Sequence, residues 1–118
     1  MHTLLSPRAH GVLDYVTVAL FALAPTVLGL VGLAATVSYA LAAIHLLMTV
    51  TTAFPLGAVA VVPFRLHGTV ELVVGVVLVA AAFLLFEGTA RTFYLVMGLV
   101  ILAVWAATDY VGTATTAR

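Results

Sequence analysis

The sequence predicts an all-α fold: a polytopic membrane four-helix bundle made of two duplicated helical hairpins. Three observations lead to this prediction. The 118 residues are 65% hydrophobic and only 7% charged, whereas about 25% of the residues in an average soluble domain are charged. Four apolar segments approach or exceed the roughly 20 residues that a helix needs to cross a bilayer. The scarce ionisable residues also recur in the same order in both halves of the chain.

The first hairpin is predicted from two apolar segments in the N-terminal half. The first span covers residues 10–30 and the second covers residues 37–54, with residues 33–36 between them. Neither span shows the polar–apolar alternation of a membrane β-barrel strand, so both are predicted to be helices. The short connection requires the two helices to be antiparallel.

The second hairpin repeats this pattern. Its spans cover residues 67–86 and 92–111, and the connection is the polar stretch 87–92. The link between the hairpins, residues 55–64, is apolar and contains two prolines. We expect this link to lie along the membrane interface.

The two hairpins match at an offset of 57 residues, which indicates an internal duplication. We predict a single transmembrane domain over residues 1–118, with one repeat at about 6–57 and the other at about 63–114. Because each repeat has two spans, both enter the membrane from the same side and should be related by a pseudo-two-fold axis along its normal. The polar matches are Arg8 with Arg65, His10 with His67, Asp14 with Glu71, and Thr51-Thr52 with Thr108-Asp109.

The segment Arg8–Leu30, RAHGVLDYVTVALFALAPTVLGL, resembles a repeat of the bacterial SPW family of small integral membrane proteins. Those repeats pair two spans and carry Ser-Pro-Trp near the far end of the first. This chain has Ala24-Pro25-Thr26 there, so only the proline is kept, and Ala81-Ala82-Phe83 in the second half lacks it. The family has no established activity, so the resemblance implies an architecture and no catalytic residue.

Arginine placement predicts the orientation of the chain. An even number of spans puts both termini on one side, which holds Arg8, Arg65 and Arg118, while Arg91 lies on the other. By the positive-inside rule, both termini should be cytoplasmic. With the resemblance above, this predicts an integral protein of the bacterial inner (plasma) membrane.

A layer of polar residues is predicted at the terminal side of the bundle. His10 and Asp14, like His67 and Glu71, are four residues apart and share one face of a helix. A carboxylate near hydrocarbon is costly, so each should face the bundle and find a partner, either an arginine or a histidine of the other repeat. The predicted layer consists of Arg8, His10, Asp14, Arg65, His67, Glu71 and Asp109.

This layer has two interpretations. In the first, the layer is a structural clasp, in which hydrogen bonds between helices fix the register of the bundle. Alternatively, it is a site for protons, for an anion, or for a divalent metal such as zinc or iron, which histidine and carboxylate ligands suit. The favoured prediction is that the chain binds no cofactor. The alternative is that it binds a divalent metal or a haem.

His45 is predicted separately, close to the membrane midplane. Its match in the second repeat is Leu102, so duplication does not account for it. A neutral histidine that packs and makes one hydrogen bond is the structural interpretation. A proton relay or an axial haem ligand is the functional one, although haem would require a second copy of His45 at the same depth.

Three function classes follow from these features. The favoured one is a structural or interaction subunit in the lipid bilayer, which forms a homo-oligomer or binds a larger membrane partner. The second is proton, ion or small-solute handling through the polar layer and His45. The third is a metal- or haem-binding protein. Four arginines balance four carboxylates, so no net charge points to nucleic acid. No catalytic set of residues is visible and cysteine is absent, which disfavours an enzyme.

Overall fold

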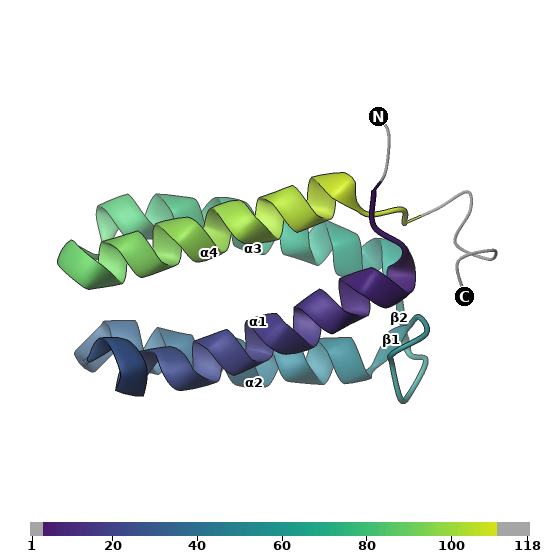
Figure 1. Cartoon of the computed structure of the whole chain (residues 1–118), viewed down its shortest axis with the longest axis horizontal. Coiled ribbons are helices and arrows are strands. Elements are labelled where there is room, and N and C mark those ends of the chain that lie inside the picture. Colours follow the sequence, from purple (N-terminus) through teal and green to yellow (C-terminus); the bar gives the residue numbers. More distant parts are fainter. Residues whose placement is uncertain (1–3, 111–118) are drawn as a thin grey trace.

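The computed structural model, which describes residues 4–110, contains four helices long and apolar enough to cross a membrane (Figure 1). Helices α1 (Pro7–Leu28) and α2 (Gly32–Val50) form one antiparallel hairpin, and α3 (Phe64–Leu84) and α4 (Gly88–Ala107) form the other. The predicted all-α four-helix bundle is therefore confirmed.

Every helix begins three to five residues before its predicted span. For α1 a capping motif explains the early start: the Ser6 side chain accepts a hydrogen bond from the Ala9 N–H, and Pro7 occupies the first helical turn. These are strong helix-start signals that draw the polar residues after them into the helix. The other three helices begin early without a side-chain cap. The predicted connection over residues 33–36 was wrong, because these residues lie within α2. Three predicted features lie outside the described residues: the end of the fourth span at residue 111, the end of the second repeat at about 114, and Arg118.

The two helices of each hairpin pack closely, whereas the hairpins diverge from one another toward their turns (Figure 1). Large side chains fill the space between the hairpins. Phe21 of α1 meets Phe93 of α4 edge to face, with ring centroids 5.7 Å apart. The Tyr94 hydroxyl donates a hydrogen bond of 2.6 Å to the Ala34 carbonyl of the other hairpin.

Two parallel β-bridges join the hairpins at the end with the termini. Strand β1 (Thr52–Ala53), which follows α2, pairs with strand β2 (Val62–Pro63), which precedes α3. Leu5, which precedes α1, pairs in the same way with Thr108, which follows α4. The end of each hairpin is thus tied to the beginning of the other.

The residues in these two bridges correspond between the repeats at offsets that differ from the constant 57 of the sequence match. Leu5 corresponds to Val62 at an offset of 57, but Thr52 corresponds to Thr108 at an offset of 56. Helix α3 has 21 residues where α1 has 22, so the offset falls from 57 to 56 along the hairpin and the counterpart of Thr52 is Thr108 and not Asp109.

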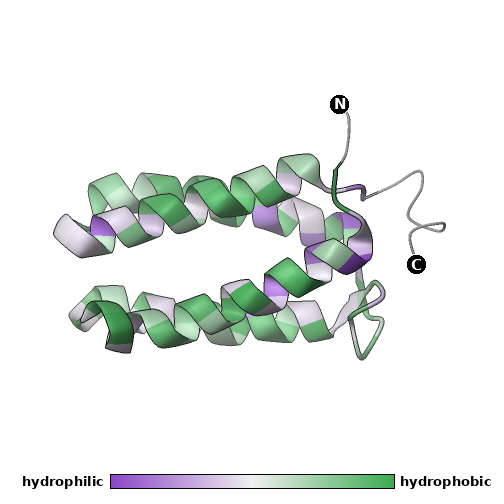
Figure 2. Cartoon of the chain, in the orientation of Figure 1, coloured by the Kyte–Doolittle hydropathy of each residue, from purple (hydrophilic) through white to green (hydrophobic). Residues whose placement is uncertain are grey.

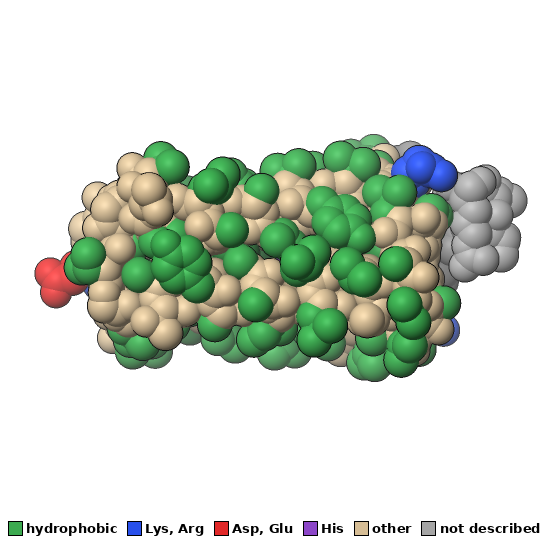
Figure 3. Space-filling model, turned by 90° about the horizontal axis from the view of Figure 1, so that it is seen from below, with side chains coloured by type: hydrophobic (Ala, Val, Ile, Leu, Met, Phe, Trp, Pro, Cys, Tyr) green, Lys and Arg blue, Asp and Glu red, His purple; other side chains and the backbone are tan. Residues whose placement is uncertain are grey.

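The surface of the bundle is apolar along the helices. In the space-filling view, apolar side chains run over the length of the visible face and charged side chains lie at its two ends (Figure 3). Hydrophilic residues are concentrated toward the end with the termini (Figure 2). This distribution is that of a bundle whose sides face lipid.

Candidate functional site

Four buried ionisable side chains converge where the two hairpins meet. His10 and Asp14 come from α1, and His67 and Glu71 come from α3. All four are at most 3% exposed. One ligand atom from each lies within 4.8 Å of the others. We call these four residues the His–carboxylate cluster.

The shortest contacts in the His–carboxylate cluster connect the two hairpins. His10 Nε2 lies 2.8 Å from Glu71 Oε1, and His67 Nε2 lies 3.0 Å from Asp14 Oδ2. The contacts within one helix are longer, 3.2 Å from His10 to Asp14 and 3.3 Å from His67 to Glu71. Each histidine therefore faces both carboxylates.

The sequence predicted that His45 lies alone, close to the midplane. In the structure it lies beside this cluster instead. Its Nε2 is 3.4 Å from Asp14 Oδ1 and 3.7 Å from Glu71 Oε2. The prediction was wrong because α2 begins at Gly32 and ends at Val50, which leaves His45 about 7.5 Å from the terminal-side end of its helix. At the structural offset of 56, its counterpart is Ile101 and not Leu102.

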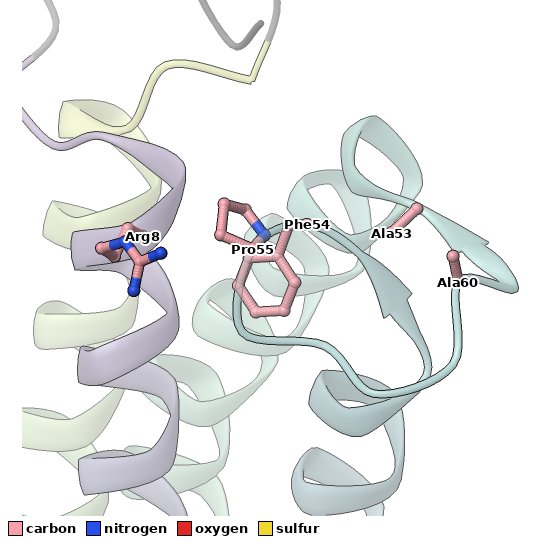
Figure 4. Close-up of a pocket in the computed structure, with 5 residues that line it drawn as sticks. All are labelled: Arg8, Ala53, Phe54, Pro55 and Ala60. Carbon is pink, nitrogen blue, oxygen red and sulfur yellow. The ribbon is translucent and has the colours of Figure 1, made fainter. Parts of the chain in front are cut away.

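The predicted arginine–carboxylate pairs do not form, because Asp14 and Glu71 pair with histidines instead. Arg8 and Arg65 are both exposed. Arg8 lines a pocket of about 390 Å³ with residues of the loop after α2, Ala53, Phe54, Pro55 and Ala60 (Figure 4). A guanidinium keeps its hydration at the membrane interface at little cost, whereas burying it beside the cluster would remove that hydration.

Asp109, the third predicted carboxylate, is half-buried just after α4. Its backbone N–H donates a hydrogen bond of 3.0 Å to the Leu5 carbonyl. Its side chain is not one of the four that converge within 4.8 Å. The position that the sequence match gave to Asp109 is occupied by Thr108.

Two threonines fix the orientation of the cluster histidines. The Thr52 hydroxyl donates to the Met48 carbonyl at 2.6 Å and lies 2.7 Å from His67 Nδ1. A hydroxyl has a single proton, so Thr52 can only accept from His67, whose Nδ1 must carry a proton.

Thr108 does the same for His10. Its hydroxyl donates to the Val104 carbonyl at 2.5 Å and lies 2.8 Å from His10 Nδ1. Both histidines therefore present Nε2 to the carboxylates. The sequence match drew attention to the threonine pairs, but not to this role.

Three aromatic side chains cover the cluster on the side of the termini. Phe64 stacks against Phe54 at 5.3 Å and packs against Tyr110 at 4.7 Å between ring centroids. These rings also contact the imidazoles, with Phe64 5.4 Å from His10 and Phe54 5.8 Å from His67. The aromatic cap, defined as Phe54, Phe64 and Tyr110, keeps the cluster away from water.

Two glycines make room for this cap. A Cβ atom on Gly68 would lie 2.7 Å from the Tyr110 ring, and one on Gly11 would lie 2.9 Å from the Phe54 ring. Tyr110 donates a hydrogen bond of 3.1 Å to Glu71 Oε1. Burial raises the pKa of the Tyr110 phenol, and the Glu71 carboxylate raises it further, so the hydroxyl keeps the proton that it donates.

Polar side chains become sparse beyond His45. The next one on the buried face of α2 is Ser38, seven residues away, whose hydroxyl donates to the Phe21 carbonyl at 2.6 Å. Between them the buried residue of α2 is Ala42. The buried histidines and carboxylates described inside the bundle are thus confined to one end of it.

No protein-family model, curated protein or solved structure matches this chain. The resemblance to SPW repeats therefore remains a prediction from the residues themselves.

Proposed function

We propose that this chain is a structural subunit of the bacterial inner membrane, in which the His–carboxylate cluster clasps two duplicated hairpins and further copies of the chain pack alongside. The clasp is supported by one observation above all. The shortest contact of each cluster histidine is to the carboxylate of the other hairpin, at 2.8 Å and 3.0 Å. The cluster thus joins the hairpins where their backbones are also bridged.

Transport across the membrane is less well supported. A proton path needs polar groups through the whole thickness of the bundle, whereas the buried histidines and carboxylates of the described residues lie at one end. Two apolar turns of α2 separate His45 from Ser38. A structural role uses the same groups without requiring such continuity.

Two matching apolar grooves support association with further copies. They lie between the diverging hairpins, one of about 380 Å³ between α1 and α4 and one of about 270 Å³ between α2 and α3. Two matched surfaces on one chain allow each copy to contact two neighbours, as in a closed ring. The first groove is lined by Leu20, Ala24, Phe93 and Met97, and the second by the corresponding Val77, Ala81, Val37 and Leu41.

Cross-linking in native membranes tests this association. The chain has no cysteine, so a single one can be introduced at Leu20 and, in a second variant, at Val77. When both variants are present in the same membranes, a bis-maleimide should cross-link their chains into dimers. Ile44→Cys is the control, because Ile44, which is 62% exposed, is more accessible than Leu20 at 46% or Val77 at 55% but lies outside both grooves. Dimer yields no higher than those of Ile44→Cys would contradict the proposal.

The proposed orientation places both termini in the cytoplasm. It is supported by the count of arginines, with Arg8 and Arg65 at the start of α1 and α3 and Arg91 near the start of α4, at the opposite end. Reporter fusions should show a cytoplasmic C-terminus and a periplasmic Gly88. A periplasmic C-terminus would contradict this orientation.

A further inference from the structure

We propose that the His–carboxylate cluster binds one divalent transition-metal ion of the zinc class, with His10, Asp14, His67 and Glu71 as its ligands. This inference rests on the proposed clasp and names the cofactor that completes it. Zinc in proteins is bound by imidazole nitrogens and carboxylate oxygens, most often by four ligands in a tetrahedron. The cluster supplies two of each.

The spacing of the ligand atoms fits a shared ion. Four ligands at zinc-bond lengths of about 2.0–2.1 Å are separated from one another by about 3.3 Å. The four histidine–carboxylate distances, which involve both oxygens of each carboxylate, run from 2.8 to 3.3 Å, and one ligand atom from each of the four residues lies within 4.8 Å of the other three. Small shifts of these side chains would therefore place one atom from each at bonding distance from a common centre.

Hydrogen bonding leaves the central atoms of the cluster unsatisfied. His10 Nε2, His67 Nε2 and Asp14 Oδ2 are fully buried, and none makes a hydrogen bond of acceptable geometry with a described residue. The distances between these atoms are short, but an imidazole protonated at Nδ1 has no proton on Nε2 to donate to a carboxylate. Buried polar groups are normally satisfied, and a cation between them would satisfy all three at once.

The tautomers prepare the histidines for a metal. Thr52 and Thr108 accept the Nδ1 protons of His67 and His10. A neutral imidazole in this state has its lone pair on Nε2, which is the atom that faces the carboxylates. Ligand histidines in metal sites are commonly held in this way, by a hydrogen bond from the ring nitrogen that does not bind the ion.

Charge balance supports a divalent ion. Two carboxylates and two neutral imidazoles carry a charge of about −2, which is very costly to bury without compensation. A divalent cation neutralises this charge. The arginines do not do so, because Arg8 and Arg65 are exposed.

The site is closed, which indicates a structural ion and not a catalytic one. Structural zinc sites have four protein ligands, whereas catalytic sites keep one position for water or substrate. The aromatic cap covers the cluster on one side, and His45 contacts Asp14 Oδ1 from the adjacent side at 3.4 Å. His45 thus orients a ligand carboxylate and is not needed as a fifth ligand.

Metal analysis of the full chain in detergent tests the site. Tag-free protein is stripped with a chelator, loaded with Zn²⁺ and dialysed, and its zinc content is measured by mass spectrometry. We expect about one zinc per chain. Co²⁺, used as a spectroscopic probe, should give the intense visible bands of tetrahedral coordination. Wild-type protein that is helical by circular dichroism but retains no zinc would overturn the proposal.

Matched variants assign the ion to the cluster. Glu71→Gln should weaken zinc binding by at least about 100-fold, since loss of a residue behind a ligand already costs 10- to 100-fold. Glu87→Gln, on an exposed glutamate, should bind as the wild type does. Equal binding by both variants would overturn the site.

Substituting one of the two threonines that bind the histidines distinguishes a metal site from a purely structural contact. Thr52→Val should lower zinc affinity by about 10- to 100-fold while the helical spectrum is kept. Thr69→Val is the control on the exposed side of α3 and should leave affinity unchanged. If the protein binds no zinc but still cross-links through its grooves, the metal site is refuted and the proposed association stands. If the protein binds zinc but never cross-links, the association is refuted and the metal site stands.

Discussion

Replacing Glu71 with leucine is expected to destabilise the bundle by about 1–3 kcal/mol, the usual cost of leaving a buried polar group without its hydrogen-bond partner. Glu71 Oε1 lies 2.8 Å from His10 Nε2 and accepts a hydrogen bond of 3.1 Å from Tyr110. Leucine would remove the acceptor of the Tyr110 hydroxyl and leave His10 Nε2 with only its longer contact to Asp14, at 3.2 Å. Reversible unfolding in detergent, followed by circular dichroism, measures the loss.

The matched control for this prediction is Glu87→Leu. Glu87 is exposed in the turn before α4, so its replacement should change the free energy of unfolding by less than about 0.5 kcal/mol. If the two leucine variants unfold alike, the cluster does not hold the hairpins together.

Replacing Gly98 with valine is expected to cost about 1–3 kcal/mol through overpacking. A Cβ atom at Gly98 would lie 3.0 Å from the Gly75 carbonyl oxygen and 3.0 Å from the Val79 nitrogen, both backbone atoms of α3. Neither atom can move aside without shifting the helix. The added side chain must therefore push α3 and α4 apart, which the same unfolding measurement detects.

Ala103→Val is the control for Gly98→Val. Ala103 lies on the exposed side of α4, so valine there adds a branched side chain to the same helix without entering the helix interface. Helix propensity falls from alanine to valine but rises from glycine to valine, so propensity alone would make the Ala103 variant the less stable of the two. A loss of stability at Gly98 no larger than at Ala103 would show that the close approach of α3 and α4 is not important for stability.

The helical class and the number of spans could be predicted because they depend on length and apolarity, which the sequence displays directly. The helix boundaries could not be placed by hydropathy, which treats polar residues as the end of a span. At Pro7 the helix begins because of a capping serine and a proline. Such local signals outweigh the polarity of Arg8 and His10 that follow.

The candidate site was only partly predictable. The four-residue spacing in α1 and α3 correctly indicated that the histidine and carboxylate of each helix lie together. The choice between arginine and histidine as the partner from the other repeat could not be made, because both lie near the carboxylate in sequence. Which one turns inward depends on desolvation in the folded bundle, and the guanidinium is the costlier group to bury.

His45 and Thr108 show a second limit of sequence reasoning. A shift of five residues in the start of α2 moves His45 from the midplane to the level of the cluster. A difference of one residue between the hairpins exchanges Asp109 for Thr108 as the partner of His10. Depth and register are properties of the assembled hairpins, and periodicity within one helix does not determine them.

The most direct test of a metal centre shared by the two hairpins is X-ray absorption spectroscopy of the zinc-loaded full chain. We predict four nitrogen or oxygen ligands at about 2.0–2.1 Å, with the multiple-scattering signal of two imidazoles. A six-coordinate shell of oxygen atoms without imidazole, as expected for an ion held loosely at the surface, would contradict a centre formed by His10, Asp14, His67 and Glu71.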